Sequence, residues 1–222
     1  MGLRLNEHAT YYKEFYGKYH EQLPRLRAEG FTPLSIEHLM RRRIEVLTAD
    51  SKVRDAWWDD YFDTTDGAAF HPDGRAKIVL DAEPLTQISP YVERSLKGEY
   101  LLLHDTFNKL EGLELTAEEI EKYHEIRIPA PQAASNPIWQ HLARDQTLLN
   151  DYVDAVSKMA ESHGEPNNMT LYFSSRDSHE QPIIRPVGLS YYGGRAAWVQ
   201  SNDMTYRLIG GVGTDSKPQW YT

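Results

Sequence analysis

The order of two kinds of hydrophobic pattern along the chain limits its fold more than any other feature of the sequence. Three stretches, 7–30, 35–47 and 145–163, carry apolar residues at the spacing of an amphipathic helix. Two others, 68–80 and 170–209, have the residue types of strands joined by turns. Helical and strand patterns therefore come in blocks, which favours an α+β fold over repeated β-α-β units. We predict helices packed against a small antiparallel sheet and hairpins.

Capping residues predict where the helices begin and end. Side chains suited to an N-cap precede the later helical patterns, at Ser35, Asp50, Thr116, Asn136 and Asp145. Glu119 follows Thr116 at the spacing of a capping box. Gly30 and Gly164 stand where a helix would end in a left-handed conformation. We expect Gly67 to have a positive φ after the helix that begins at Asp50.

Turn signals predict hairpins between the strands. Asp73-Gly74 separates strand-like runs at 68–71 and 75–80, and Gly193-Gly194 separates two aromatic-rich runs further along. We also predict a short strand at 100–103 and a linker at 129–135.

The 222 residues are enough for one large domain or for two compact halves. Shifts in composition divide the chain into a helical segment, 1–63, and a hairpin and loop segment with a short helix, 64–128. A pair of helices followed by antiparallel strands makes up a third segment, 129–222. We predict that the three segments form one compact domain.

Charge and cysteine content exclude several classes of function. The formal net charge is -9, and the one dense basic cluster, Arg41 to Arg43, would point in directions about 100° apart on a helix. We therefore expect a solvated helix flank there and no binding to nucleic acid. Because there is no cysteine, thiol nucleophiles and thiolate metal sites are excluded. We expect no cofactor, and a divalent cation would have to bind His, Asp or Glu.

Hydropathy excludes a membrane span. No apolar run approaches the roughly 18 residues that a transmembrane helix needs, and the first 15 residues contain no apolar core of a signal peptide. We predict a cytoplasmic protein that does not bind membranes, and a protein partner is compatible with this composition.

An acidic window between Asp55 and His71 is the most suggestive candidate for chemistry. On a continuous helix, Asp55, Asp59 and Asp63 would lie on one face, where like charges repel unless a cation binds them. The hypothesis is a divalent metal site made by Asp59, Asp63, Asp66 and His71. The alternative is a solvated acidic face followed by a turn that needs Asp and Gly for its backbone conformation.

Aromatic side chains near the second glycine pair suggest a binding surface. Tyr191, Tyr192 and Trp198 would meet at the Gly193-Gly194 hairpin and could stack on a ligand, or they could pack across the two strands. A histidine pattern elsewhere is weaker. His104 and Thr106 fit the H-x-T signature of two-histidine phosphoesterases, but the companion His8 lies at a predicted helix start rather than in a strand.

Several stretches together resemble a group of uncharacterised archaeal proteins known mainly from metagenomes. The residues that carry the resemblance are Tyr61-Phe62-Asp63-Thr64-Thr65-Asp66-Gly67-Ala68-Ala69-Phe70, Asn136-Pro137-Ile138-Trp139 through Asp151-Tyr152-Val153, and Arg207-Leu208-Ile209-Gly210-Gly211. The resemblance implies an archaeal cytoplasmic protein of unknown function, and it provides no catalytic residues.

Two hypotheses about function remain, and the sequence leaves open whether the chain is an enzyme. The first is a non-enzymatic binding or interaction protein, because no complete catalytic set is present. The alternative is a divalent-metal-dependent hydrolase centred on Asp59, Asp63, Asp66 and His71. Convergence of those four side chains in space is the observation that would favour the second.

Overall fold

The computed structural model describes residues 11–86, 100–123, 126–172, 180–191 and 206–211. The strands are β1 (Tyr12–Gly17), β2 (Thr32–Pro33), β3 (Phe62–Phe70), β4 (Ala76–Val79), β5 (Tyr100–Leu101), β6 (Leu113–Leu115), β7 (Ile126–Pro129), β8 (Asn168–Leu171), β9 (Ile183–Leu189) and β10 (Tyr206–Gly211). The helices are α1 (Tyr19–Ala28), α2 (Ile36–Glu45), α3 (Ser51–Trp58), α4 (Glu83–Thr86), α5 (His104–Lys109), α6 (Ala117–Lys122), α7 (Ala130–Ala133), α8 (Pro137–Ala143) and α9 (Gln146–His163). The predicted α+β class is confirmed.

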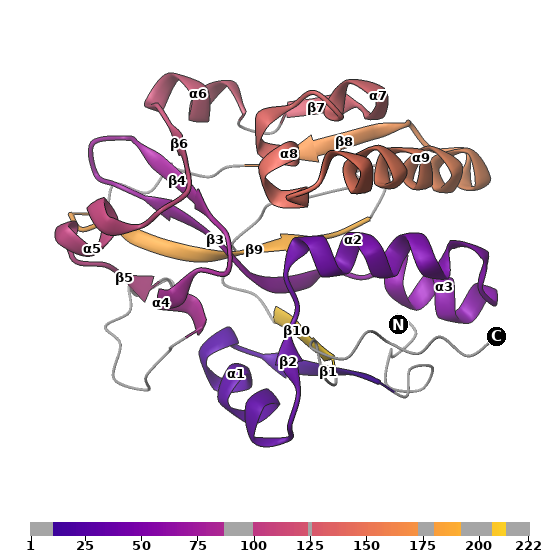
Figure 1. Cartoon of the computed structure of the whole chain (residues 1–222), viewed down its shortest axis with the longest axis horizontal. Coiled ribbons are helices and arrows are strands. Elements are labelled where there is room, and N and C mark those ends of the chain that lie inside the picture. The colour runs from indigo at the N-terminus through magenta and orange to yellow at the C-terminus, as the bar shows by residue number, and fades with distance from the viewer. Residues whose placement is uncertain (1–10, 87–99, 124–125, 173–179, 192–205, 212–222) are drawn as a thin grey trace.

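Strand β3 is the central element of the main sheet (Figure 1). Along one edge it pairs with β9 in antiparallel register, and along the other it pairs with β10 at Asp63 and with β4 from Gly67 to Phe70. The pairing with β10 is parallel, whereas the other pairs in this sheet are antiparallel. β1 pairs with β10, so the first and last described strands are neighbours. β7 and β8 form a separate two-stranded sheet.

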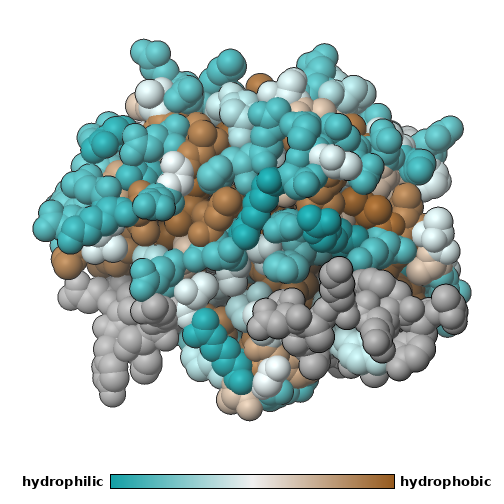
Figure 2. Space-filling view, in the orientation of Figure 1, coloured by the Kyte–Doolittle hydropathy of each residue, from teal (hydrophilic) through white to brown (hydrophobic). Residues whose placement is uncertain are grey.

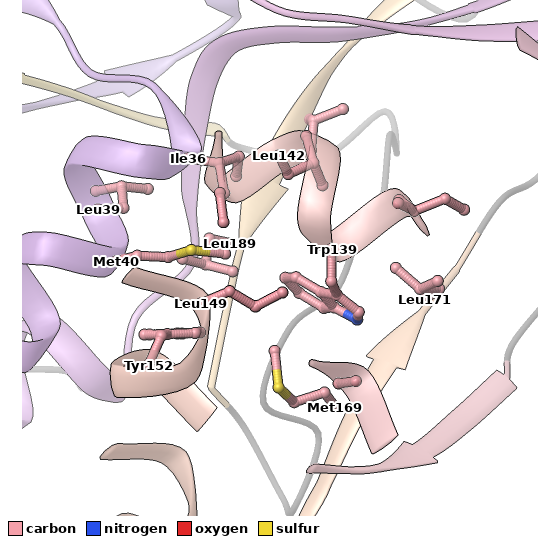
Figure 3. Packing of buried hydrophobic residues seen from close by; sticks show 14 of the residues in the cluster. Ile36, Leu39, Met40, Trp139, Leu142, Leu149, Tyr152, Met169, Leu171 and Leu189 are labelled. Atoms are coloured by element: carbon pink, nitrogen blue, oxygen red, sulfur yellow. The ribbon is translucent and has the colours of Figure 1, made fainter. Parts of the chain in front are cut away.

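Helices cover both faces of the sheet and enclose two clusters of buried side chains. The larger cluster brings together α2, α3, α8 and α9, and Figure 3 shows Trp139 at its centre between α2, α9 and β8. The smaller cluster joins α1, α4 and α5 to the other face. Neighbouring residues of β3 point to opposite clusters: Ala68 and Phe70 to the larger, Ala69 to the smaller. The sheet is therefore the middle layer of three.

The predicted helix over 7–30 is wrong within the described residues. Residues 12–17 form strand β1, and the helix begins only at Tyr19. Gly17, the last residue of β1, has a φ of 133°, which a continuous helix does not allow. The aromatic residues of this stretch also suit a strand, and pairing with β10 decides between the two conformations. Phe15 is nevertheless buried, as expected.

Most capping predictions are confirmed. Ser35, Asp50, Asn136 and Asp145 each accept a hydrogen bond from a backbone N–H in the first turn of their helices, and Thr116 forms the capping box with Glu119. Gly30 and Gly164 have positive φ, at 82° and 65°. The hairpin between β3 and β4 turns at Gly74, and the predicted linker at 129–135 instead contains helix α7. Gly193 and Gly194 lie outside the described residues.

Two predictions at the junction of α3 and β3 are wrong. The helix ends at Trp58, so Asp63 lies in the strand and does not share a helix face with Asp55 and Asp59. Gly67 lies inside β3 and is not among the residues with positive φ. Crowding explains this glycine instead, because a Cβ atom there would lie 2.9 Å from the side chain of Ile184 and 3.0 Å from Ala82 and Leu85.

Arg43 is fully buried, so the predicted solvated flank is wrong for this residue, although Arg41 is exposed. The Nε of Arg43 donates to the Trp57 carbonyl at 3.0 Å, and its Nη2 donates to the carbonyls of Asp60 and Leu189 at 2.9 and 3.2 Å. Nη1 donates to the Tyr152 hydroxyl at 3.1 Å. One side chain of α2 thus joins α3, α9 and β9.

Replacement of Arg43 by Lys tests this contact. An ammonium group has no planar fork and cannot reproduce these four bonds, so Arg43→Lys should lower the free energy of unfolding by about 2–4 kcal/mol. Arg41→Lys on the same helix is the matched control and should change it by less than about 0.5 kcal/mol. Chemical denaturation measures both variants. Equal stability of the two would contradict the role assigned to Arg43.

Gly67→Ala should also destabilise the protein, because the added methyl group overpacks the space between β9 and α4. We expect a loss of about 1–3 kcal/mol in the free energy of unfolding, measured by denaturant titration. A variant more stable than the wild type would show that Ile184, Ala82 and Leu85 are not packed as described.

Candidate functional site

The four residues of the predicted metal site do not form one group. Asp59 is exposed at the end of α3, Asp63 and Asp66 are buried in β3, and His71 lies in the turn beyond that strand. Within the ranges that the structure describes, no three His, Asp or Glu side chains are arranged to hold a metal ion. The hypothesis of a divalent cation on these four residues therefore gains no support from their positions.

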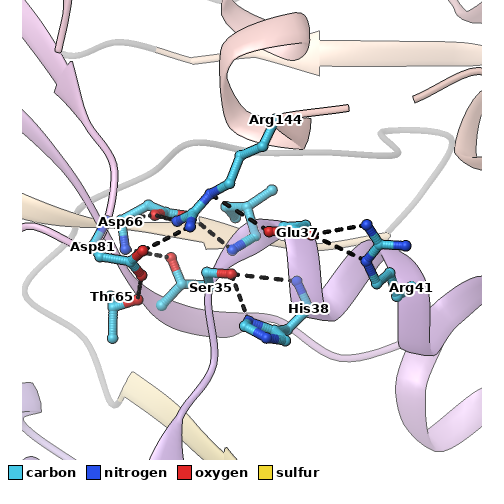
Figure 4. A network of polar contacts seen from close by, with 10 residues as sticks. Ser35, Glu37, His38, Arg41, Thr65, Asp66, Asp81 and Arg144 are labelled. Carbon is cyan, nitrogen blue, oxygen red and sulfur yellow. Dashed lines mark hydrogen bonds and ion pairs between the residues drawn. The ribbon is translucent and has the colours of Figure 1, made fainter. Parts of the chain in front are cut away.

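Asp66 is instead the centre of a polar network (Figure 4). Its Oδ2 accepts from the backbone N–H of Ile36 at 2.8 Å, and its Oδ1 accepts from the backbone N–H of Asp81 at 2.9 Å. The guanidinium of Arg144 bridges two carboxylates, with Nη2 2.8 Å from Asp66 and Nη1 2.7 Å from Asp81. Thr65 donates to the other oxygen of Asp81 at 2.9 Å. The network connects β3, the start of α2, the end of α8 and the segment after β4.

The backbone is strained at two residues of this network. Arg144 has a φ of 61° and Asp81 a φ of 43°, and they are the non-glycine residues with positive φ in the described ranges. Each such conformation costs on the order of 1–3 kcal/mol and persists only where the surroundings hold it. Here the two strained residues are salt-bridged to each other, so the ion pair itself holds them.

Burial and hydrogen bonding act in opposite directions on the two carboxyl groups. Burial is the largest influence on Asp66 and raises its pKa, although backbone N–H groups and Arg144 act against it. Partial burial also acts to raise the pKa of Asp81, but hydrogen bonds from Arg144 and Thr65 outweigh it, so the pKa lies below its usual value. Asp81 therefore stays charged and keeps Arg144 in place.

A cavity of about 340 Å³ lies beside the network. The residues that line it include Arg27, Phe31, His38, Thr65, Asp81 and Thr86. Thr65 and Asp81 are already held by the network, while His38 Nδ1 lies 2.7 Å from the Ser35 hydroxyl. The cavity has an apolar wall at Phe31 and carries groups of either charge, Arg27 and Asp81.

Asp63 is the second unusual carboxyl group of β3. It is completely buried, and the Tyr61 hydroxyl donates to its Oδ1 at 2.8 Å. Burial raises its pKa to about 8, and the hydrogen bond from Tyr61 opposes the rise. The Tyr61 ring lies against Gly188 of β9, where any Cβ atom would overlap it. Burial therefore favours the neutral acid form of Asp63 in the folded protein.

The predicted aromatic site is described only in part. Tyr191 is buried, and its ring lies edge-on to Trp58 with centroids 5.3 Å apart. Burial is the main cause that raises its pKa to about 12. Tyr192 and Trp198 lie outside the described residues. The binding role of these three residues stays a prediction.

No sequence pattern marks Asp81 or Arg144 as functional residues. Neither belongs to a motif, and their partners are far away in sequence, since Arg144 contacts Asp66 and Asp81 across 78 and 63 positions. One local feature of the sequence could have drawn attention to Arg144: it lies between the helical pattern that starts at Asn136 and Asp145, the N-cap of the next helix.

Hydrophilic side chains cover most of the face seen in Figure 2, and hydrophobic ones show between them. None of the helices in the described ranges combines the length and the hydropathy that crossing a bilayer requires.

Comparison with solved structures shows which fold the layers and strands form. The chain is similar to a solved structure reported under the words "Accommodation of massive sequence variation in Nanoarchaeota by the C-type lectin fold". The TM-score is 0.68 over 90% of this chain and 97% of that chain, with 16% sequence identity. At this identity the likeness shows the fold alone, and the archaeal source of that protein agrees with the resemblance seen in the sequence. No protein-family model and no curated protein matches the chain.

The raised pKa of Asp63 predicts a pH dependence of stability. Between its ordinary pKa of 3.8 and about 8, the folded state holds a proton that the unfolded state has released. The contribution of Asp63 to the free energy of unfolding is therefore largest below pH 3.8. It falls as the pH rises from 3.8 to about 8, by at most about 1.4 kcal/mol per pH unit.

Asp63→Asn mimics the protonated acid and removes this dependence. The stability of the variant relative to the wild type should rise steadily between pH 5 and pH 8, as measured by denaturant titration at each pH. A constant difference across this range would mean that Asp63 is ionised in the folded protein.

Proposed function

We propose that the chain is a non-enzymatic binding protein in which the C-type lectin fold supports a contact surface. The observation that carries the proposal is the fold likeness, which covers 90% of this chain and 97% of the solved one. The words under which that structure is reported say that the C-type lectin fold accommodates massive sequence variation in Nanoarchaeota. A fold that tolerates such variation is suited to presenting different surfaces to different partners.

The ionisable groups in and around β3 support this proposal because structural contacts occupy them. Asp66 and Asp81 are bound by Arg144, and Arg43 donates to carbonyl groups and to Tyr152. Asp63 is enclosed beneath Tyr61. No specific observation favours the alternative of a metal-dependent hydrolase on Asp59, Asp63, Asp66 and His71.

The predicted binding residues Tyr191, Tyr192 and Trp198 belong to the segment between β9 and β10. The strands on either side of this segment flank the same residue, because Asp63 pairs with Gly188 of β9 and with Leu208 of β10. Residues 190–205 contain Tyr, Trp, Arg, Ser, Gly and Asn, the residue types of protein-binding loops. We propose that Tyr192 and Trp198 contact a protein partner, while Tyr191 anchors the segment on Trp58.

A double variant tests this function. Tyr192→Ser/Trp198→Ser should leave the melting temperature within about 2 °C of the wild type, because residues of a contact surface contribute little to the free energy of unfolding. The labelled variant should lose the signals that the wild type gives on arrays of random peptides and glycans. Lys158→Ser on α9 is a control outside this segment and should keep them.

Two results would contradict the proposal. One is a pattern of array signals that the double variant shares with the wild type. The other is a fall in melting temperature of more than about 5 °C, which would place Tyr192 and Trp198 in the core. If the wild type binds glycans on the array and no peptides, the chain is still a binding protein, but its partner is a carbohydrate and the proposed protein partner is wrong.

A further inference from the structure

Two histidines far apart in sequence lie against each other at one end of the sheet. His71 follows the last residue of β3, and His104 is the first residue of α5, which lies beside the turn of the β3–β4 hairpin (Figure 1). Nε2 of His71 is 2.9 Å from Nδ1 of His104, and the ring centroids are 5.0 Å apart. Neither residue belongs to the network around Arg144.

The position of His71 is fixed by its backbone and by its ring. Its N–H donates to the Arg75 carbonyl at 2.8 Å, and its own carbonyl accepts from Gly74 at 2.9 Å, which closes the turn. The ring packs on Phe107 with centroids 4.9 Å apart. A side chain held in this way loses little conformational entropy when a ligand binds.

Asp73 determines which nitrogen of His71 carries the proton. Nδ1 of His71 lies 2.8 Å from Asp73 Oδ1 and 3.3 Å from the Asp73 backbone nitrogen. The carboxylate contact is the shorter and can only accept, so Nδ1 is the donor and Nε2 presents its lone pair toward His104. A carboxylate behind a histidine is the usual outer contact of a metal-binding imidazole.

We propose that His71 Nε2 and His104 Nδ1 together bind one divalent transition-metal ion, with Asp73 as a positioning residue and water as the other ligands. Two nitrogens bound at 2.0–2.1 Å and near a right angle are about 2.9 Å apart, which is the separation observed here. His104 binds a metal through Nδ1 as the neutral tautomer that carries its proton on Nε2, so the Nδ1 proton passes to solvent while a solvent proton binds His104 Nε2, and the ring stays neutral.

The ligands select the class of metal. Two imidazoles suit Cu²⁺, Ni²⁺ and Zn²⁺, with Cu²⁺ binding most tightly, whereas Ca²⁺ and Mg²⁺ need oxygen ligands. The described part of the chain supplies no third ligand, so two protein ligands leave open positions for water. The positive charges of Arg75 and Lys77 lower the affinity for a metal ion by repulsion. Arg75 contacts Asp73 and Lys77 lies over the Phe107 ring, so the two histidine nitrogens stay available to the metal. This site shares His71 with the divalent-cation hypothesis but uses none of its aspartates.

Copper binding tests the proposal in the full chain. With Cu²⁺ in a buffer that does not chelate metal, electron paramagnetic resonance of the wild type should show coupling to two imidazole nitrogens. Calorimetry should show His71→Gln and His104→Ala weakened at least about tenfold, and Asp73→Asn weakened about 10–100-fold. His163→Ala removes an exposed histidine elsewhere on the surface and should bind as the wild type does.

The proposal is overturned if the His71→Gln/His104→Ala variant binds Cu²⁺ as tightly as the wild type, or if the wild-type spectrum has no coupling to two imidazoles. His104 is exposed, so its replacement should leave the melting temperature without metal within about 2 °C. If His71→Gln is unstable, loss of the two-imidazole coupling in His104→Ala assigns the signal to this pair among the nine histidines, and unchanged coupling in His104→Ala overturns the proposal.

Discussion

Strand β3 is buried at every one of its residues and is paired along both edges, and the rest of the structure depends on this constraint. A strand in this position normally contains apolar residues, yet β3 contains Asp63, Thr64, Thr65 and Asp66. Burying a carboxylate without partners costs several kcal/mol, so the surrounding elements must supply donors or the group must take a proton. Asp66 receives donors from the surrounding elements, and for Asp63 burial favours the protonated form.

Asp66 acquires donors, and those donors define how the helices sit on the sheet. The backbone N–H of Ile36 fixes the start of α2 over β3, and Arg144 fixes the end of α8. Arg43 repeats the arrangement with the charges reversed, because a buried cation near the end of α2 is surrounded by carbonyl oxygens. Helix α2 is thus held to the sheet by polar contacts of both signs, which specify one orientation where apolar packing alone allows several.

Local signals in the sequence predicted those elements whose causes are local. The caps at Ser35, Asn136 and Asp145, the hairpin at Gly74 and the stripe of α9 depend on neighbouring residues. The strand β1 was missed because its aromatic spacing also fits a helix, and only pairing with β10 distinguishes the two. The aspartates of β3 suggested a solvated or metal-binding face, since nothing nearby in sequence reveals Arg144 as their partner. Gly67 was assigned to a turn because crowding by β9 is a long-range contact.

Native-state hydrogen exchange tests most directly the claim that β3 is the rigid centre of a scaffold that is independent of residues 192–205. We expect the amides of β3 that pair with β4 and β9 to exchange only through global unfolding, with the free energy that denaturant titration gives. The Tyr192→Ser/Trp198→Ser chain should show the same protection. Exchange of β3 through local opening, or its acceleration in the substituted chain, would contradict the account.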